Sequence, residues 1–283
     1  MRLRLGMTIL LVLALVAAAC GDSEGDDGGG GESCAIEDLE LVAPGMLTIA
    51  TGEPVFPPWM IDDDPTNKQG FESAVAYAIA SEMGFADDEV QWVRTGFDQA
   101  IAPGPKSFDF NIQQYSITAE RDEVVDFSDG YYTASQALIA YADSPVQDAT
   151  TLDDLKPYRL GAAIGTTSLD FIEEVIEPDT EPAVYDTNAD AKAAFDAGQL
   201  DGLVLDLPTA YFVTAVEIEE AAIVAQFASP AEDPEEFGLL FAEGNSLVDC
   251  VNEAIAALED EGTLTALADE WLTEASDIRV IDE

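Results

Sequence analysis

The chain has 283 residues, of which 58 are acidic, ten are basic and none is histidine, so its formal net charge is −48. Its hydrophobic fraction of 48 % is enough for one large domain or two of ordinary size. A field this negative argues against nucleic acid and anionic lipid headgroups as partners, and the absence of histidine excludes Ser-His-Asp and Cys-His catalysis. Adaptation to a saline medium is one explanation of the acidity, which composition alone does not decide.

The N-terminus is typical of a secretory signal, predicted over residues 1–19. Two arginines precede an apolar run over residues 5–19, which is too short to span a bilayer comfortably and ends in small residues. The alanines followed by Cys20 resemble a bacterial lipobox, in which the peptidase cuts before the cysteine and lipid is attached to its sulfur. Ordinary secretion, with Cys20 incidental, is the alternative.

Residues 20–33 are predicted to be a flexible acidic linker, because Gly, Ser and Asp dominate and large apolar residues are absent. The folded body then begins near Cys34. Outside the cell a pair of cysteines is more often bridged than free, so Cys34 and Cys250 are expected to form a disulfide, with two buried thiols as the alternative. No metal site is expected, since a lone cysteine pair without histidine is a poor transition-metal site.

Strand-like apolar runs then alternate with helical patterns along the body. The expected strands are residues 46–51, 89–95, 108–112, 136–142, 159–164, 182–186, 200–206 and 237–242. Helical spacing is clearest at residues 71–84 and 188–198, which end at Gly84 and Gly198. This alternation predicts an α/β architecture with mostly parallel sheets, in which ligands bind beyond the carboxyl ends of strands and at helix N-termini.

Four loops between these elements carry residue types that suit a ligand. Residues 51–60 place aromatic side chains around two prolines, and residues 113–121 end in an arginine among many acids. Residues 163–171 run from a strand through Gly and two threonines into a helix, and residues 203–208 end a strand in an aspartate. The structural alternatives are core aromatics, a surface ion pair, a helix N-cap and one more solvated carboxylate.

In this order, the features resemble the bacterial solute-binding proteins of family 3, the receptors of polar amino acid ABC transporters. The strongest motif is SITAERDEVVDFSDGYY at residues 116–132, and FPPW, GAAIGTTS and AFDAGQLDGLVLD support it. The resemblance implies a periplasmic-binding-protein-like type II fold, with two α/β lobes joined by two crossing strands and the ligand cleft between them. Lobe one would combine residues 34–137 and 239–283, and lobe two would be residues 138–238.

The resemblance also implies roles for residues that bind the backbone groups of an amino acid. Arg121 matches the arginine that binds the α-carboxylate, through a planar fork of donors that fits a carboxylate in two parallel bonds. Asp206 matches the acid that accepts the α-ammonium, and Gln114 matches a position that contributes backbone atoms. The remaining hydroxyl residues of this site are Ser116, which holds carboxylate or amine, and Thr166 and Thr167, which complete the carboxylate site.

Three further matches concern the ligand's side chain. Phe56 and Phe97 match two aromatic walls, and Glu53 matches an acid that meets a distal positive charge in members that take cationic amino acids. This pattern favours a cationic or other polar amino acid. The bulky NIQQY at residues 111–115 departs from the small residues usual in the family, so the ligand class stays open.

The resulting hypothesis is a monomeric receptor, lipid-anchored on the outer face of the cytoplasmic membrane, that delivers an amino acid to the permease and ATPase of an ABC importer. It requires no cofactor and no catalysis. The alternative is an enzyme on the same fold, similar to cyclohexadienyl or arogenate dehydratases, which would need a positioned acid–base pair in the cleft.

Overall fold

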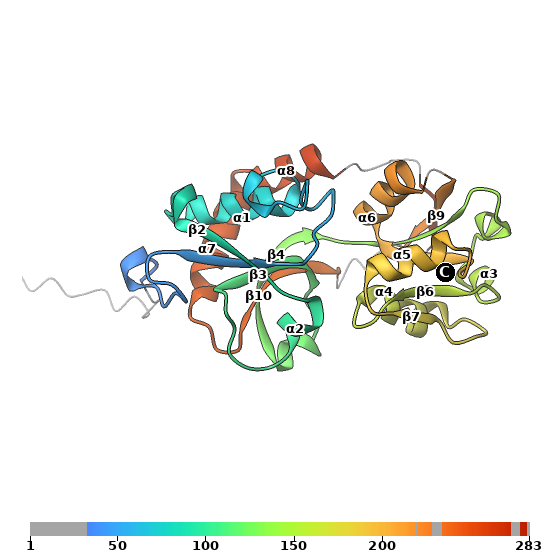
Figure 1. Cartoon of the computed structure of the whole chain (residues 1–283), viewed down its shortest axis with the longest axis horizontal. Coiled ribbons are helices and arrows are strands. Elements are labelled where there is room, and N and C mark those ends of the chain that lie inside the picture. Colours follow the sequence, from blue (N-terminus) through green and yellow to red (C-terminus); the bar gives the residue numbers. More distant parts are fainter. Residues whose placement is uncertain (1–32, 219, 228–233, 273–277, 282–283) are drawn as a thin grey trace, which may run out of the picture. The chain divides into compact units, whose positions relative to one another are not determined.

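A computed structural model describes residues 33–218, 220–227, 234–272 and 278–281. The predicted signal peptide, Cys20 and the linker up to residue 32 lie outside the described residues. The body, Ser33–Glu283, contains two β-sheets, each covered by helices (Figure 1). Within the described ranges, no helix combines the length and the apolar character needed to cross a membrane.

The first sheet has five strands in the order β2 (Val90–Arg94), β1 (Leu47–Thr51), β3 (Phe110–Ser116), β10 (Glu236–Ala242) and β4 (Val125–Thr133). Strand β1 is parallel to β2 and β3, whereas β10 is antiparallel to both β3 and β4. All five residues of β1 are buried, as expected for an interior strand between two parallel neighbours in a covered sheet. The first sheet shares its main hydrophobic core with helices α1 (Phe71–Glu82), α7 (Leu247–Asp260) and α8 (Thr263–Trp271). The short helix α2 (Phe97–Ile101) lies between β2 and β3 in the chain.

The second sheet has six strands in the order β11 (Val280–Ile281), β9 (Ala221–Phe227), β5 (Gln136–Tyr141), β8 (Gly202–Asp206), β6 (Leu160–Ala163) and β7 (Ala183–Tyr185). Strands β6, β7 and β8 are parallel, and β5 is antiparallel to β8 and β9. Its helices are α3 (Leu152–Leu155), α4 (Thr167–Phe171), α5 (Asn188–Asp196) and α6 (Leu207–Phe212), and both α4 and α6 continue as one π-helical turn.

The chain passes from the first sheet to the second between β4 and β5, and it returns between β9 and β10. These two crossings are the ones that a type II binding-protein fold requires. The predicted lobe boundaries at residues 137/138 and 238/239 stay a prediction. Strand β11 pairs with β9 in the second sheet, although its residues fall in the segment assigned to lobe one.

The loop between β1 and α1 is fixed against the start of that helix. The amide of Phe71 donates to the carbonyl of Pro58 at 2.9 Å, and the amide of Glu72 donates to that of Trp59 at 3.0 Å. Gly70, with φ of +94°, makes this approach possible, because a Cβ atom there would meet the Trp59 carbonyl oxygen at 2.5 Å. The aromatic loop predicted from the sequence is therefore held rigidly at the end of β1.

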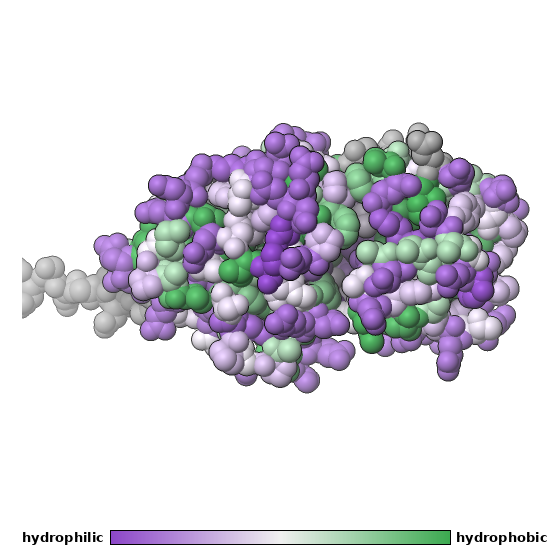
Figure 2. All heavy atoms as spheres, viewed as in Figure 1, coloured by the Kyte–Doolittle hydropathy of each residue, from purple (hydrophilic) through white to green (hydrophobic). Residues whose placement is uncertain are grey.

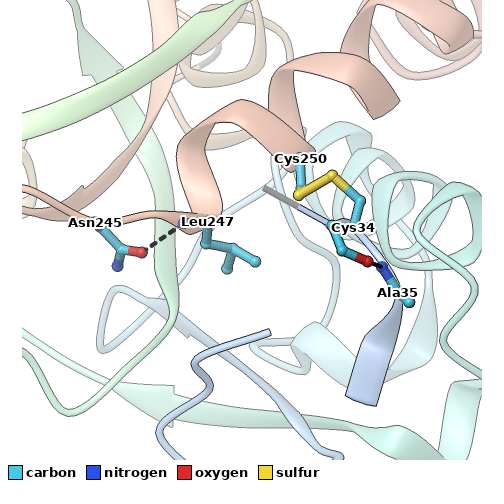
Figure 3. Close-up of a disulfide and its surroundings, with 6 residues drawn as sticks. Cys34, Ala35, Asn245, Leu247 and Cys250 are labelled. Carbon is cyan, nitrogen blue, oxygen red and sulfur yellow. Dashed lines mark hydrogen bonds between the residues drawn. A yellow bond between two sulfur atoms is a disulfide. The ribbon is translucent and has the colours of Figure 1, made fainter. Parts of the chain in front are cut away.

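Cys34 and Cys250 form the predicted disulfide, with Cα atoms 5.5 Å apart and 216 residues between them in the chain (Figure 3). Cys250 is buried in α7, which begins where the side chain of Asn245 accepts from the amide of Leu247 at 2.9 Å. The bond joins the first described residues to a helix near the end of the chain. Figure 2 shows hydrophilic residues over much of the face viewed, as the composition leads one to expect.

Candidate functional site

A cavity of about 390 Å³ is lined by residues that belong to both sheets and to the loops beyond them. All nine residues predicted to bind a ligand lie in its lining: Glu53, Phe56, Phe97, Gln114, Ser116, Arg121, Thr166, Thr167 and Asp206. The structure therefore brings together residues separated by more than half of the chain. Their contacts decide what each can do.

The aromatic loop after β1 contributes one wall of the cavity. Trp59 is 3 % exposed, and its indole nitrogen donates to the hydroxyl of Thr209 on α6 at 2.8 Å. This hydrogen bond joins the loop after β1 in the first sheet to a helix that packs with the second sheet. Phe56, in contrast, is 40 % exposed, which makes its ring available to a ligand. The core alternative thus fits Trp59 and does not fit Phe56.

Arg121 follows β3 on a short 3-10 turn and is only 8 % exposed. Its guanidinium donates to the carbonyl of Ser116 at 2.6 Å and to that of Gly165 at 2.8 Å, and it lies 5.4 Å from the ring centre of Phe97. The described residues place no carboxylate within 4.0 Å of it. Burial lowers the pKa of Arg121, against the opposing effect of the more distant Asp170. Arg121 is therefore a buried cation that has no direct counter-ion among the described residues, rather than a member of a surface ion pair.

The two threonines after β6 have different partners. The hydroxyl of Thr166 accepts from the amide of Leu169 at 3.3 Å and donates to the carbonyl of Ala163 at 2.8 Å, so Thr166 caps α4. Thr167 extends toward β3 instead, with its hydroxyl 3.3 Å from that of Ser116. The N-cap alternative is correct for Thr166, while the hydroxyl of Thr167 is turned toward Ser116 and Glu235.

A polar cluster lies where the crossing segments meet, and it consists of Ser116, Gln136, Thr167, Asp206 and Glu235. The carboxylate of Glu235 accepts from the hydroxyls of Ser116 at 2.6 Å and Thr167 at 2.5 Å. The side-chain amide of Gln136 donates to Glu235 at 3.0 Å and to Asp206 at 3.2 Å. Burial, and then the charge of Glu235, raise the pKa of Asp206 to about 7.

Gln114 has a left-handed backbone with φ of +49°, which is unusual for a residue other than glycine. Buried Glu72 holds it there by accepting from its amide at 2.7 Å and from its side-chain nitrogen. Glu72 also accepts from the hydroxyl of Tyr131 at 2.5 Å, and burial raises the pKa of Glu72 to about 7. Glu72 thus supports the cavity wall from behind.

The cavity lining carries further charges. Lys192 on α5 forms an ion pair with Glu217 at 2.7 Å, and its ammonium lies 5.6 Å from the ring centre of Phe56. Glu53 lines the same cavity, as do two further carboxylates, Asp98 and Asp186. Carboxylates therefore outnumber basic side chains along the lining.

Sequence reasoning missed three polar residues of this region. Lys192 could have been predicted, because basic residues are so rare in this acidic chain that each of the ten is a candidate for a functional role. Glu235 carries no such signal among 58 acidic residues, and Gln136 reads as one polar position in an apolar strand. Among the described residues, no group of three or more acidic or cysteine side chains is placed to hold a metal ion.

Comparison with known proteins agrees with this geometry. The model of the bacterial extracellular solute-binding proteins, family 3, matches residues 47–274. The L-cystine-binding protein TcyJ of Escherichia coli is 27 % identical over 222 residues, which are 77 % of this chain and 80 % of that protein. ABC transporter arginine-binding protein 1 of Escherichia coli is 29 % identical over 212 residues, which are 71 % of this chain and 81 % of that protein.

A solved structure of an ancestral arginine-binding protein bound to arginine superimposes with a TM-score of 0.67 at 28 % identity. The match covers 81 % of this chain and 99 % of that one. These relatives are binding proteins, and their fold has the two α/β lobes described above. The chain therefore belongs to the bacterial extracellular solute-binding proteins, family 3, with a type II periplasmic-binding-protein fold.

Proposed function

We propose that the protein is the extracytoplasmic receptor of an ABC importer and that it binds a free amino acid between its two lobes. The observation that carries this proposal is the pair of opposite charges in one cavity. Arg121, from the turn after β3, offers a buried cation to an α-carboxylate, and Asp206, at the end of β8, offers an acid to an α-ammonium. The names of the cystine- and arginine-binding relatives support the same ligand class.

The remaining lining residues suit the ligand's side chain. Phe56 and Phe97 provide apolar faces, and the cavity volume of about 390 Å³ lies in the range of small-molecule sites. Glu53 and the excess of carboxylates favour a cationic or other polar side chain. A ligand that contacts both lobes binds the closed form better than the open form, so it shifts the population toward closure. The permease and ATPase of the importer would respond to that closed form.

The same proposal includes the parts of the hypothesis that lie at the N-terminus. Cleavage before Cys20, lipid on its sulfur and the linker of residues 20–33 would tether a monomeric body to the outer face of the cytoplasmic membrane. The family's extracellular character supports the location. Mass spectrometry of the protein extracted from membranes would detect the lipid on Cys20, and an unmodified, cleaved N-terminus would refute the anchor.

Thermal unfolding of the mature protein against the twenty amino acids tests the receptor. A ligand at about 100 times its dissociation constant adds roughly 2.7 kcal/mol to the free energy of unfolding, which is a visible shift. A shift with one or a few amino acids supports the proposal. If neither the twenty amino acids nor L-cystine shifts the unfolding transition, the protein is not an amino acid receptor.

One observation favours a second candidate, an enzyme of the dehydratase type. Asp206 has its pKa raised to about 7, as a general acid at neutral pH requires. Turnover of prephenate or arogenate, detected through the absorbance of the aromatic product, would establish this activity. Binding of these compounds without turnover would exclude the enzyme and leave the receptor as the only candidate.

A further inference from the structure

Glu235 stands at a fixed point of the second crossing, one residue before β10. Its backbone carbonyl accepts from the amide of Ala134 in the first crossing at 2.8 Å, so the two crossing segments are tied together here. From this point its carboxylate reaches Ser116, Thr167 and Gln136. No matching role for this residue follows from the motifs of the family, so its contacts need an explanation of their own.

The two hydroxyls have a direction that the carboxylate sets. A hydroxyl has one hydrogen to donate, and an ionised carboxylate accepts hydrogen bonds but donates none. Ser116 and Thr167 both donate to the same Oε1 atom of Glu235, at 2.6 and 2.5 Å. Only oxygen lone pairs of these two hydroxyls are then left for a ligand in the cavity that both residues line.

The amide of Gln136 is oriented in the same way. Its oxygen accepts from the hydroxyl of Ser168 at 2.6 Å, so its nitrogen faces the acids. That nitrogen lies 3.2 Å from an oxygen of Asp206 and 3.3 Å from the hydroxyl of Thr167. Asp206 and the hydroxyl of Thr167 therefore both accept from the same amide nitrogen.

Asp206, Ser116 and Thr167 thus offer acceptors to one cavity that Arg121 also lines, and the hydroxyls of Ser116 and Thr167 lie 3.3 Å apart. We propose that Glu235 is a positioning residue that turns the hydroxyls of Ser116 and Thr167 into acceptors, and that the three acceptors form a site for a protonated primary amine. The proposal deepens the proposed function and rests on it. It also reassigns Thr167, because a hydroxyl without a free hydrogen cannot donate to the α-carboxylate, which is left to Arg121 and backbone groups.

The site would be selective for primary amines, because an ammonium has three hydrogens for the three acceptors. An N-methyl amino acid loses one of these hydrogen bonds, and a 2-hydroxy acid loses the positive charge as well. A charge-assisted hydrogen bond typically contributes about 1.5–3 kcal/mol, and a tenfold change in affinity corresponds to about 1.4 kcal/mol. We therefore expect each such change of the amine to weaken binding about 10- to 100-fold.

The decisive variant is Glu235→Gln, measured by calorimetry with L-arginine, L-glutamine and L-cystine and with the 2-hydroxy acid analogues of the first two. An amide at position 235 can donate to the hydroxyls, whose hydrogens are then free to face the cavity. We expect the variant to bind the amino acids about 10- to 100-fold more weakly and the 2-hydroxy acids no more weakly than the wild type. Glu236→Gln is the matched control, since that side chain lies beside Gly130 instead of the polar cluster.

A pH profile separates positioning from a general structural role. Glu235 and, in the opposite direction, Arg121 act on Asp206, and buried Tyr131 of β4 lies within reach of its charge. Because the pKa of Asp206 is raised to about 7, amine affinity of the wild type should increase as the pH rises through 7. In Glu235→Gln this increase should move to lower pH, because one of its causes is removed. Thr167→Val, which removes one acceptor, should weaken the binding of amino acids and leave its pH dependence unchanged.

Tighter or unchanged amino acid binding by Glu235→Gln would overturn the proposal, since Glu235 would then merely compete with the ligand's carboxylate. If the variant does not fold, the wild-type comparison of amino acids with N-methyl and 2-hydroxy analogues decides, and equal affinities refute the amine site. If the wild type binds no amino acid, the proposed function fails, and agmatine and putrescine become the probes. Binding of either amine that Glu235→Gln weakens would keep the amine site, and no binding of either would end it.

Discussion

Arg121 and Asp206 differ in how the protein prepares them for a ligand. Arg121 is buried and held by two backbone carbonyls, so its position is fixed before any anion arrives. Asp206 is partly buried beside Glu235, so its ionisation is unfavourable until a cation binds next to it. Both side chains are thus in states that an amino acid's two charges would stabilise.

Replacing Arg121 by alanine should leave Lys192 as the one basic side chain among the described residues that line the cavity. Removing one partner of a buried ion pair costs about 3–5 kcal/mol. Calorimetry should therefore show affinity for the bound amino acid reduced roughly 100-fold to several thousand-fold. Arg159→Ala, an exposed position in the second lobe, is the control and should bind normally. Near-normal affinity of Arg121→Ala would contradict the assigned role.

Glu72 gives a prediction about stability and pH. Its pKa in the folded protein is about 7, above the ordinary value of 4.5, so the folded state holds a proton that the unfolded state releases between these values. Its contribution to the free energy of unfolding should therefore fall as the pH rises from about 4.5 to 7, by about 3 kcal/mol at most.

Glu72→Gln should flatten this fall, and urea unfolding at a series of pH values measures it. Glu82→Gln, an exposed position on the same helix, provides the control and should keep the wild-type slope. The same slope in Glu72→Gln and in the wild type would show that Glu72 is not the group responsible.

Among the secondary-structure elements, those with strong apolar runs were predictable. The expected strands at residues 46–51, 136–142 and 200–206 correspond to β1, β5 and β8, whose residues are almost all buried. Strands β4 and β9 are not among the predicted strands. Strand β4 contains Asp, Ser and Gly residues that interrupt its alternation, and β9 is rich in alanine, which has little strand preference.

The candidate site was predictable where a motif carried it and not where side chains meet across the crossings. The nine residues with family matches all line the cavity, because each lies near the end of a strand or in the segment that follows one. Gln136 and Glu235 lie 99 residues apart in the chain and contact each other only because the two crossing segments run side by side. No local periodicity records such a contact, so the structure was needed to find it.

The disulfide acts at the level of elements, since it fastens the start of the body to helix α7. Converting both cysteines to alanine, Cys34→Ala with Cys250→Ala, should lower the free energy of unfolding by about 2–5 kcal/mol, because the reduced unfolded chain gains conformational freedom. Urea unfolding measures the change. Amino acid affinity should not change, because neither cysteine lines the cavity. A loss of affinity without a loss of stability would place the bond in the binding function instead.

For the molecule as a whole, charge is the dominant quantity. The sequence carries a net charge of −48, and the described residues form four ion pairs, so most carboxylates of the described part have no basic partner. Repulsion among them opposes the compact state more than the expanded one, and salt screens it over a Debye length of about 10 Å at 0.1 M and about 3 Å at 1 M.

The free energy of unfolding should therefore rise between 0.05 and 1 M sodium chloride, with each kcal/mol raising the melting temperature by about 2–4 °C for a domain of this size. Scanning calorimetry at constant pH measures the shift. Choline chloride at the same ionic strength is the matched control, because screening depends on ionic strength and not on the identity of the cation. Equal shifts in both salts would support self-repulsion, whereas a shift in sodium chloride alone would point to specific sodium binding. A melting temperature that does not change with either salt would show that the acidic surface is already tolerated in the folded state.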